Sequence, residues 1–516
     1  MCLNPGSDFK PEDGNVWKQW DFSAPIFESF LIYGPPDFTG MNPPECLYEY
    51  PPLNKASDYN MEYFLFLDGP QFTSHKINTE EAILELYSLP IKPSDHILSI
   101  RSELGNPLYF YSLRFRFTPF SRPSVKSQKQ IDEFIFYRDL KQYPSCLFAI
   151  CFVASHPFHD LYFRLLKTIV QIEASSRITS SNLIDLSRFN HGSDKTTGTW
   201  PNCTYKTRKK FLKLLYDLNL PSFNEYLVFQ INQSLTKIWR WKMPSHDEIG
   251  LQMAVWGSKF LFQWMNSKDF ISLLSHLFLE YYVIVIGENI ESIVRSVSLI
   301  PQLIYPFFWT YPIITILPDE KYELLGSPVP LIVGLYKSQK AMNMIKSLVD
   351  KEATVFIDLD KKEMIFPRKK IAPKVALSNE YSKALKPLLR SKRKEYNKEF
   401  HKSIVKAIND VTNIFIERIT ASIITKVDNF LPVGSMFSEE CYQVFFVKTE
   451  IPFVQTHINT QMFYSIKEQI CRKRTDDETK EFTPLQTLIS IGAWNLKRSG
   501  SISPSSFEMD PVSLNE

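Results

Sequence analysis

The feature that most constrains this chain is a strongly apolar run that proline interrupts repeatedly. Residues 299–318 read LIPQLIYPFFWTYPIITILP, and SPVPLIVGLY follows at 327–336. Together with the apolar residues before it, the run is long enough to tempt a membrane-spanning interpretation. Pro301, Pro306 and Pro312 would each break a spanning helix. We therefore expect these residues to form a buried core and not a membrane span.

The pattern around this run predicts an α/β sheet that is covered on both faces. Apolar residues recur at helical spacing over 270–282, and a second helix is predicted over IESIVRSVSLIPQLIY. Four short apolar runs have the length of buried strands: YYVIVIG, IITILP, PLIVGLY and ATVFIDLD. Such strands, alternating with helices, are typical of a parallel sheet with helices on both sides.

The sequence on either side of this region has a different pattern of apolar and polar residues. Strands are predicted at FESFLIYGP, EYFLFLDG, LYFYSLRFRF and LFAICFVAS, and the last leads into a helix at HPFHDLYFRLLKTIVQIEAS. Residues 185–207 are rich in glycine and small polar residues, which predicts an exposed linker. Residues 376–428 and the segment FVQTHINTQMFYSIKEQI are predicted to be helical. The serine-rich end of the chain is too polar to fold alone.

Composition limits the chemistry that the chain can perform. Its 516 residues suggest roughly two to four domains, and its net charge of +3 gives no general attraction to nucleic acid. The 7 cysteines form no C-x-x-C pair and are expected to be free thiols in a reducing compartment. No phosphate-binding loop, nucleophile elbow or zinc-protease motif occurs. With no apolar signal core at the N-terminus, we expect a cytoplasmic protein without catalytic residues, cofactor or metal.

Two pairs of residues have both a functional and a structural interpretation. His156 and His159 could share a helical face and bind a metal, but no further ligand completes the site, so a role at the helix entry is favoured. Asp358 and Asp360 could hold Mg²⁺ from one face of a strand. The favoured alternative is that they end the strand and bond the backbone of the following turn.

Three further features have simpler interpretations. Glu280 is expected to make an ion pair or a helix-end hydrogen bond within the protein, although it could contact a partner. Trp309 and the phenylalanines beside it are expected in the core. Two basic runs, at 367–374 and 388–398, could contact anionic lipid at about 1 kcal/mol per basic residue, or could be solvated helix faces.

The order and spacing of the motifs resemble the three consecutive sections of DENN-domain proteins, over most of the chain. The first section is matched by FESFLIYG and FVASHPFHDLYFRLL, and the last by the Thr-Gln-x-Phe of TQMF at 460–463. In the central section, Leu331 stands where the family usually has an aromatic residue. The central matches are the apolar run ending at Leu279-Glu280, the Tyr-Pro-Phe-x-Trp of Tyr305 to Trp309, Pro312 with Leu317-Pro318, Ser327-Pro328-Val329-Pro330 with Gly334, and Asp358-Leu359-Asp360.

The resemblance implies a two-lobe α/β fold. An N-terminal longin-like lobe of sheet and helices would occupy residues 15–180, and a linker would follow at 181–245. The C-terminal lobe, a three-layer α/β structure completed by helices, would combine a central section at 246–375 with a helical section at 376–475. Residues 476–516 would form a mostly disordered tail.

The resemblance also implies a function. Many DENN-domain proteins are guanine-nucleotide exchange factors, which promote GDP release from Rab-family small GTPases in membrane trafficking. The chain would then be a regulator rather than an enzyme, cytoplasmic or peripheral on endomembranes, in transient contact with an anionic membrane surface. The alternative is a DENN-fold scaffold that binds small GTPases or trafficking complexes without exchange activity. The candidate GTPase-binding residues are Tyr281, Tyr282, Glu288 and Asn289; equally, the tyrosines could pack inside the sheet and Asn289 could cap a helix.

Overall fold

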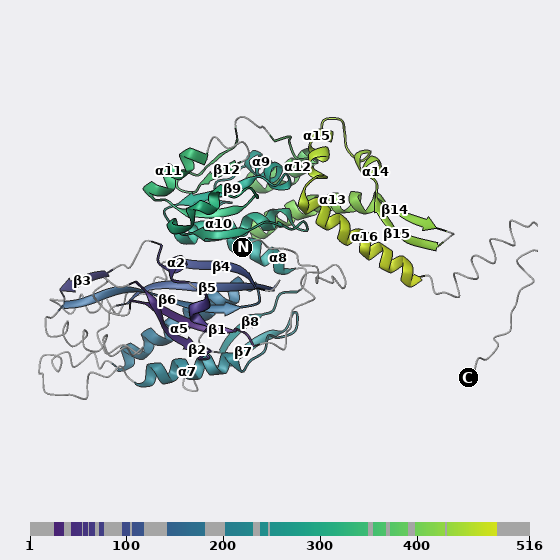
Figure 1. Cartoon of the computed structure of the whole chain (residues 1–516). Helices are drawn as coiled ribbons and strands as arrows, with labels where there is room; N and C mark the ends of the chain where they lie inside the picture. Colours follow the sequence, from purple (N-terminus) through teal and green to yellow (C-terminus); the bar gives the residue numbers. More distant parts are fainter. Residues whose placement is uncertain are drawn as a thin grey trace, which may run out of the picture.

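The structure is a computed structural model of the chain. It describes residues 25–35, 43–53, 55–59, 61–67, 72–76, 95–103, 106–117, 142–180, 202–230, 238–245, 248–348, 354–367, 372–390, 398–428 and 431–481. The fold is mixed α/β, as predicted, and two sheets organise it (Figure 1).

The first sheet is antiparallel and comes from the N-terminal part of the chain. Its strand order is β2-β1-β6-β5-β4, and β3 also pairs with β6. Helices α5 (His159–Ser180) and α7 (Asn202–Tyr216) pack on each other, and α5 lies on β5 and β6. The strands are β1 (Ser29–Gly34), β2 (Glu45–Tyr50), β3 (Phe72–Lys76), β4 (Asp95–Glu103), β5 (Asn106–Phe117) and β6 (Gln142–Ala154).

The second sheet is the parallel sheet that the apolar runs predict. Its order is β10-β11-β9-β12-β13, with β9 to β12 parallel and β13 antiparallel at one edge. Alternate residues of β9 enter different cores, since Val283 and Val285 join the large core whereas Ile284 and Ile286 pack in a smaller cluster with Tyr322. Both faces are therefore covered, as predicted. The strands are β9 (Tyr282–Gly287), β10 (Ile313–Leu317), β11 (Ile332–Tyr336), β12 (Thr354–Asp358) and β13 (Glu363–Ile365).

Helices and short 3-10 turns complete this second sheet. They are α8 (Ile249–Gly257), α9 (Ser267–Phe278), α10 (Ile290–Leu299), η4 (Ile300–Ile304), η5 (Asp319–Gly326) and α11 (Gln339–Leu348). The first sheet meets the second through β4, which contacts α10 and β10 (Figure 1). At this contact the Thr315 hydroxyl donates to the Leu98 carbonyl. One continuous apolar core includes residues of both sheets.

Two regions before the parallel sheet differ from the sequence prediction. The expected strand EYFLFLDG is instead the short helix α2 (Glu62–Leu65), preceded by α1 (Ala56–Tyr59), because a helical turn buries both Met61 and Leu65. The expected linker at 181–245 contains α7 and the hairpin of β7 (Tyr226–Gln230) and β8 (Ile238–Lys242). Residues 202–207, expected in the exposed linker at 185–207, begin α7. Residues 181–201 lie outside the described residues.

The C-terminal part is helical with one exception. The helix predicted to continue to 428 ends at Ala421, and β14 (Ile423–Asp428) then pairs with β15 (Leu431–Phe437). The β-branched residues of IITKV favour a strand at this point. The helices are α12 (Ser378–Arg390), α13 (Lys398–Ala421), α14 (Glu439–Gln443), α15 (Ile451–His457) and α16 (Gln461–Glu481). Most of the predicted tail, from 482 onward, is outside the described residues.

The proline-interrupted run lies in the core, as predicted. Phe307 is 1% exposed, and its ring centroid lies 5.4 Å from that of Phe278 and 5.4 Å from that of His457. Trp309 is also buried. Among the helices of the described ranges, none combines the length and apolar character that a membrane crossing requires.

Glu280 joins the parallel sheet to the C-terminal helices. One carboxylate oxygen accepts a hydrogen bond of 2.7 Å from the Met462 amide, and the other accepts from the Gln461 amide at 3.2 Å and from the Tyr311 hydroxyl at 3.0 Å. The carboxylate thus satisfies free N–H groups in the first turn of α16. The prediction of a helix-end hydrogen bond for Glu280 is confirmed.

Truncating Phe307 tests the buried run. Phe307→Ala should lower the free energy of unfolding by about 3–5 kcal/mol, because the lost ring leaves a cavity among other aromatic rings. Chemical denaturation would measure it, with Phe445→Ala as the matched control, since Phe445 is 43% exposed. Equal free energies of unfolding for the two variants would contradict a core position for Phe307.

Removing the Glu280 carboxylate tests the joint to α16. Glu280→Ala should reduce stability by about 1–3 kcal/mol, because buried N–H and O–H donors lose their acceptor. Amide hydrogen exchange at Gln461 and Met462 should quicken at the same time. Glu417→Ala, an exposed change on α13, is the control. Unchanged exchange at both amides would show that Glu280 does not hold this helix end.

Candidate functional site

The predicted site residues lie at the two ends of the central strand β9. Tyr281 and Tyr282 are at its start, and Glu288 and Asn289 follow its last residue, Gly287. A strand rises about 3.3 Å per residue, so roughly 20 Å separates the two pairs. The structure brings Glu288 and Asn289 together but does not bring them to the tyrosines.

The two tyrosines have contacts within the protein. Tyr281 is 7% exposed, and its ring meets that of His276 edge-on at 4.8 Å. Tyr282 is half-buried, and its hydroxyl donates to the backbone carbonyl of Ser327. Burial raises the pKa of both phenols. Each tyrosine therefore supports the start of the parallel sheet, whatever else it contacts.

Glu288 and Asn289 form the exposed entry to α10. Asn289 is the N-cap of that helix, and its side-chain oxygen accepts a 2.8 Å hydrogen bond from the Ser292 amide. The backbone N–H of Glu288 donates to an Asp360 carboxylate oxygen at 3.2 Å. The Glu288 side chain itself has no hydrogen bond or ion pair to any residue that the structure describes. Its carboxylate is thus available to solvent or to a partner.

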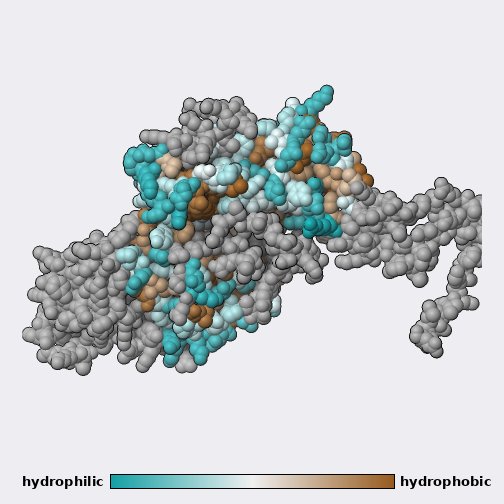
Figure 2. Space-filling view, viewed as in Figure 1, coloured by the Kyte–Doolittle hydropathy of each residue, from teal (hydrophilic) through white to brown (hydrophobic). Residues whose placement is uncertain are grey.

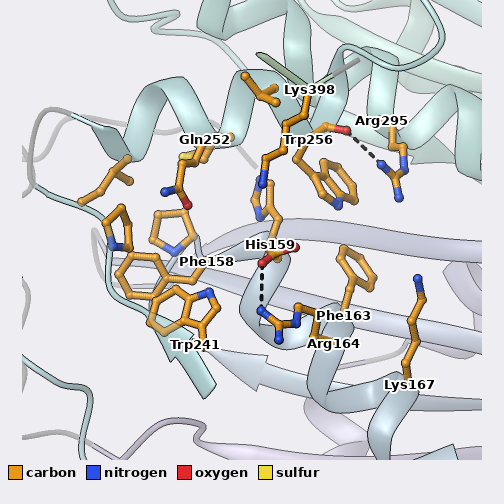
Figure 3. Close-up of a pocket in the computed structure, with 16 residues that line it drawn as sticks. Phe158, His159, Phe163, Arg164, Lys167, Trp241, Gln252, Trp256, Arg295 and Lys398 are labelled. Atoms are coloured by element: carbon orange, nitrogen blue, oxygen red, sulfur yellow. Dashed lines mark hydrogen bonds and ion pairs between the residues drawn. The ribbon is translucent and has the colours of Figure 1, made fainter. Parts of the chain in front are cut away.

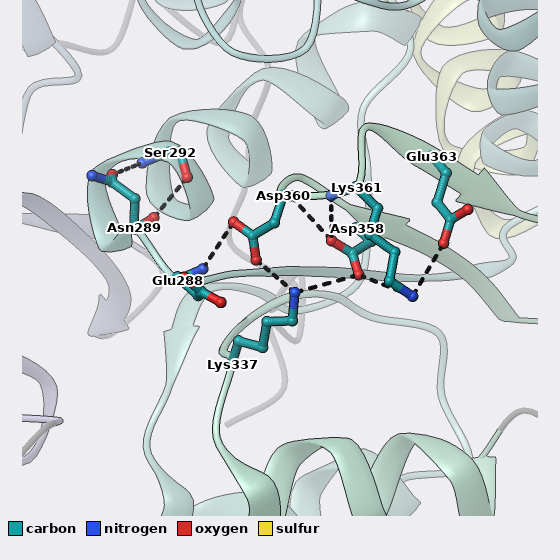
Figure 4. A network of polar contacts seen from close by, with 8 residues as sticks. All are labelled: Glu288, Asn289, Ser292, Lys337, Asp358, Asp360, Lys361 and Glu363. Atoms are coloured by element: carbon teal, nitrogen blue, oxygen red, sulfur yellow. Dashed lines mark hydrogen bonds and ion pairs between the residues drawn. The ribbon is translucent and has the colours of Figure 1, made fainter.

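A polar network surrounds Glu288 at the carboxyl edge of the parallel strands (Figure 4). Its centre is Lys337, which directly follows β11 and whose ammonium lies 2.8 Å from the Asp360 carboxylate and 3.8 Å from that of Asp358. The hydrogen bond to Asp360 raises the pKa of Lys337. At the far side, Lys361 lies 3.5 Å from Glu363. We call this cluster the edge network; its members are Glu288, Asn289, Lys337, Asp358, Asp360, Lys361 and Glu363.

The edge network resolves the two interpretations of Asp358 and Asp360. One Asp358 oxygen accepts hydrogen bonds of 3.0 Å from the amides of both Asp360 and Lys361, as a residue that closes a turn does. The prediction is therefore confirmed for Asp358, which ends β12 and bonds the backbone of the following turn, whereas Asp360 lies in that turn and accepts from the Glu288 amide instead. Within the described ranges, no group of three or more His, Cys, Asp or Glu side chains is arranged to hold a metal ion.

The two histidines at the start of α5 are buried and hydrogen-bonded. The Tyr111 hydroxyl lies 2.8 Å from the His156 carbonyl and 3.1 Å from Nδ1 of His159. Burial, with the Arg295 guanidinium as a second cause, lowers the pKa of His159 to about 3, so its ring is neutral. The favoured role at the helix entry agrees with these contacts.

Sequence reasoning missed two features. Lys337 carries no motif, and only its position after a predicted strand could have indicated an edge residue. An apolar turn between α14 and α15 was also missed, although four consecutive apolar residues beside polar sequence could have indicated it. In this turn Val444 is 83% exposed, Phe445 and Val447 are also exposed, and Phe446 is buried. Figure 2 shows hydrophobic surface near these C-terminal elements.

The edge network has polar groups of the kind that can recognise a partner. It presents exposed carboxylates and amide groups held by helix and turn backbone, and its lysines are paired with carboxylates. Parallel α/β sheets commonly bind ligands and partners at the carboxyl ends of their strands. Residues of mixed charge on fixed backbone can fix the orientation of a protein partner.

Comparison with known proteins gives a consistent result. Residues 146–362 match the DENN (AEX-3) domain. Myotubularin-related protein 5 of Caenorhabditis elegans is 23% identical over 159 residues, which are 28% of this chain and 9% of that protein. DENN domain-containing proteins 2A and 2B of Mus musculus are 28% and 27% identical over 118 and 117 residues. These two matches each cover 21% of this chain, and 12% and 10% of the relatives.

The chain therefore matches only about a tenth of the length of these relatives. The matched domain contains β9 to β12, the helices around them and the turn that bears Asp358 and Asp360. The chain thus has a DENN domain match at residues 146–362, and two of its relatives are named as DENN domain-containing proteins.

Proposed function

We propose that this chain is a guanine-nucleotide exchange factor that promotes GDP release from a Rab-family small GTPase. Proteins of the DENN family are known in general as Rab exchange factors, and they regulate without bond chemistry of their own. The observation that carries the proposal is the domain match over residues 146–362, which includes the parallel sheet and most of its edge network.

Exchange needs differential binding and no catalytic side chain. A Rab holds GDP through its phosphate loop, Mg²⁺ and ordered switch segments. A protein that binds the nucleotide-free form more tightly than the GDP form weakens GDP binding by the same factor, because the two equilibria are linked. An exposed, backbone-anchored polar edge agrees with such a role, since its groups are already oriented before the partner arrives.

Within the proposed function, Glu288 and Asn289 are our first candidates for GTPase contact. Both are exposed, and the Glu288 carboxylate, which lies near Lys337, makes no hydrogen bond or ion pair in the described part of the chain. Tyr282 is a second candidate, half-buried at the other end of β9. Tyr281 would have to leave its packing against His276 to make contact.

The lobe arrangement is part of the same proposal. We infer that the antiparallel sheet with α5 and α7 corresponds to the longin-like lobe, and that the parallel sheet with the C-terminal helices corresponds to the second lobe. The order of the elements agrees with this division. We propose domain boundaries at 15–180, 246–375 and 376–475. The segment 181–245, which was expected to be a linker, contains α7 and the β7–β8 hairpin.

Membrane contact is a further part of the proposal. The chain would be cytoplasmic and would touch endomembranes transiently through its basic runs. Part of each run, including residues 368–371 and 391–397, lies outside the described residues. Lys374, Arg390 and Lys398 belong to the described part and are exposed, which agrees with contact to anionic lipid.

The first test is release of fluorescent GDP from a panel of Rab GTPases by the purified full chain. Acceleration by roughly tenfold or more on one or a few Rabs is expected, because coupling energies of 1–3 kcal/mol correspond to about 5- to 150-fold. Binding of a nucleotide-free Rab without faster release would support the scaffold alternative. Neither binding nor release with any Rab would contradict exchange activity and also a scaffold that acts through Rab binding.

The second test reverses the charge at the edge network. Glu288→Lys should slow exchange about tenfold, since a charge at a protein interface governs association and register. The free energy of unfolding should change by less than about 0.5 kcal/mol, because the side chain is exposed. Exchange rate and melting temperature should be measured on the same preparations.

Two variants control this test. Glu417→Lys makes the same charge change at an exposed site on α13 and should leave exchange unchanged. Tyr282→Phe removes only the hydroxyl that binds Ser327 and should lower stability by about 0.5–1.5 kcal/mol. Full exchange activity in Glu288→Lys would remove Glu288 from the site, whereas slower exchange in Tyr282→Phe at unchanged stability would assign that hydroxyl to the GTPase surface.

A further inference from the structure

A cavity lies where the helices of the two sheets meet. Its walls come from the start of α5, the end of β8, α8, α10 and the first residue of α13, and its volume is about 280 Å³ (Figure 3). This is near the lower end of the range for small-molecule sites. No sequence motif indicated it, because its walls come from segments that are far apart in the chain.

The base of the cavity is aromatic and closely packed. Phe158 contacts Trp241 with ring centroids 5.4 Å apart, and Phe163 stacks on Trp256 at 5.2 Å with an interplanar angle of 2°. These rings are buried and support one another. The base therefore offers a fixed apolar surface, on which a ring of a ligand could lie.

The rim is strongly cationic. Arg164, Lys167, Arg295 and Lys398 line the cavity, and Asp160 is the single carboxylate among the lining residues. Asp160 already lies 3.6 Å from Arg164. Arg295 is paired with Glu291 at 2.9 Å and donates to the Trp256 carbonyl at 3.0 Å. Positive charge on the rim therefore exceeds the negative charge that the lining itself supplies.

Two of these cations are not directly paired in the described part of the chain, although Asp160 and Glu291 lie near enough to Lys167 to attract it. Lys167 and Lys398 make neither an ion pair nor a hydrogen bond with the residues that the structure describes. Figure 3 shows Lys398 extending from α13 and Lys167 from α5 on the opposite wall. Burial, with the nearby Arg295 guanidinium as the second cause, lowers the pKa of Lys167. An anion in the cavity would offset this repulsion.

Two helix starts add to the positive field. His159 is the first residue of α5 and Ile249 is the first residue of α8, and both line the cavity. The N-terminal end of a helix carries partial positive charge and favours an anion. Gln252, also in the lining, supplies an amide that can bond a hydroxyl group.

We propose that this cavity binds a small phosphorylated polyol of the inositol phosphate type. The phosphate groups would contact Lys167, Lys398 and Arg295, and the carbon ring would lie against the aromatic base. The same chemistry can come from a soluble inositol phosphate or from the headgroup of a phosphoinositide lipid. Because α5 belongs to the first sheet and α8 and α10 to the second, a bound ligand would hold the two together.

The test is binding of inositol 1,4,5-trisphosphate to the full chain by calorimetry, with melting temperature as a second readout. The wild-type chain should bind and melt at a higher temperature with the ligand present. Lys167→Glu/Lys398→Glu should weaken binding by roughly tenfold or more, because charge-assisted hydrogen bonds to phosphate are lost. Affinity should fall as salt is raised.

Matched controls make the result decisive. Lys406→Glu changes an exposed lysine on α13 outside the cavity and should bind like the wild type. Unphosphorylated inositol should not bind. Vesicles containing phosphatidylinositol 4,5-bisphosphate distinguish the sources: binding of the soluble compound supports a free ligand, and binding of vesicles alone, lost in the double variant, supports a lipid headgroup. No binding of either probe, or equal binding by Lys167→Glu/Lys398→Glu, would overturn the proposal.

Discussion

The burial of α10 on almost every side is the constraint on which the rest of the structure depends. This helix packs on β9, β10 and β11, on α8, and on β4 of the other sheet. Its sequence, IESIVRSVSL, allows neighbouring elements to pack close to the helix, because small serines stand between branched apolar residues and are themselves buried. Two glycines fit this packing: a Cβ at Gly257 would lie 2.6 Å from the Arg295 carbonyl oxygen, and one at Gly334 would lie 2.4 Å from Ile293 and 2.3 Å from the Thr315 carbonyl oxygen. Larger residues at either position would force α10 away from its neighbours.

The polar groups that could act on a partner lie where this packing ends. Asn289 closes the start of α10, and Gly287 accepts a 2.9 Å hydrogen bond from the Lys337 amide, so the turns after β9 and β11 are fixed to each other. The Asp358 carboxylate fixes the turn after β12 by accepting hydrogen bonds from the amides of Asp360 and Lys361. The edge network is therefore oriented by the sheet itself, and it needs little reorganisation to bind. Such pre-organisation is what allows a protein surface to distinguish two states of a partner.

The sequence predicted those parts of the fold whose patterns are local. The helices α9 and α10 and the strands β9 to β12 follow from helical spacing and continuous apolar runs, and the role of Glu280 follows from its place after an apolar helix. The helix at 62–65 was missed because EYFLFLDG holds a short continuous apolar run, which has the length of a buried strand, while its burial depends on distant residues. The hairpin at 423–437 was missed because IITKV follows a long helical pattern directly. Lys337 and the cavity could not be predicted, since each depends on residues that only the folded chain brings together. Only the resemblance to DENN-domain proteins pointed to a GTPase, because recognition surfaces carry no catalytic spacing.

The same helix connects the edge network with the cavity. Asn289 stands at its start and Arg295 lies six residues further on, which is about 9 Å along the axis. Arg295 already shares its charge between Glu291 and the Trp256 carbonyl, so an anion beside it would compete for the same guanidinium. Because α10 is held on nearly all sides, it would respond as a rigid element together with the sheets around it. By linkage, a ligand that strengthens the contact between the two sheets would favour a partner complex that keeps this contact and would disfavour a complex that separates the sheets. If both proposals hold, the charge on one helix face would thus couple a small anion to the proposed recognition of a GTPase at the other end of that helix.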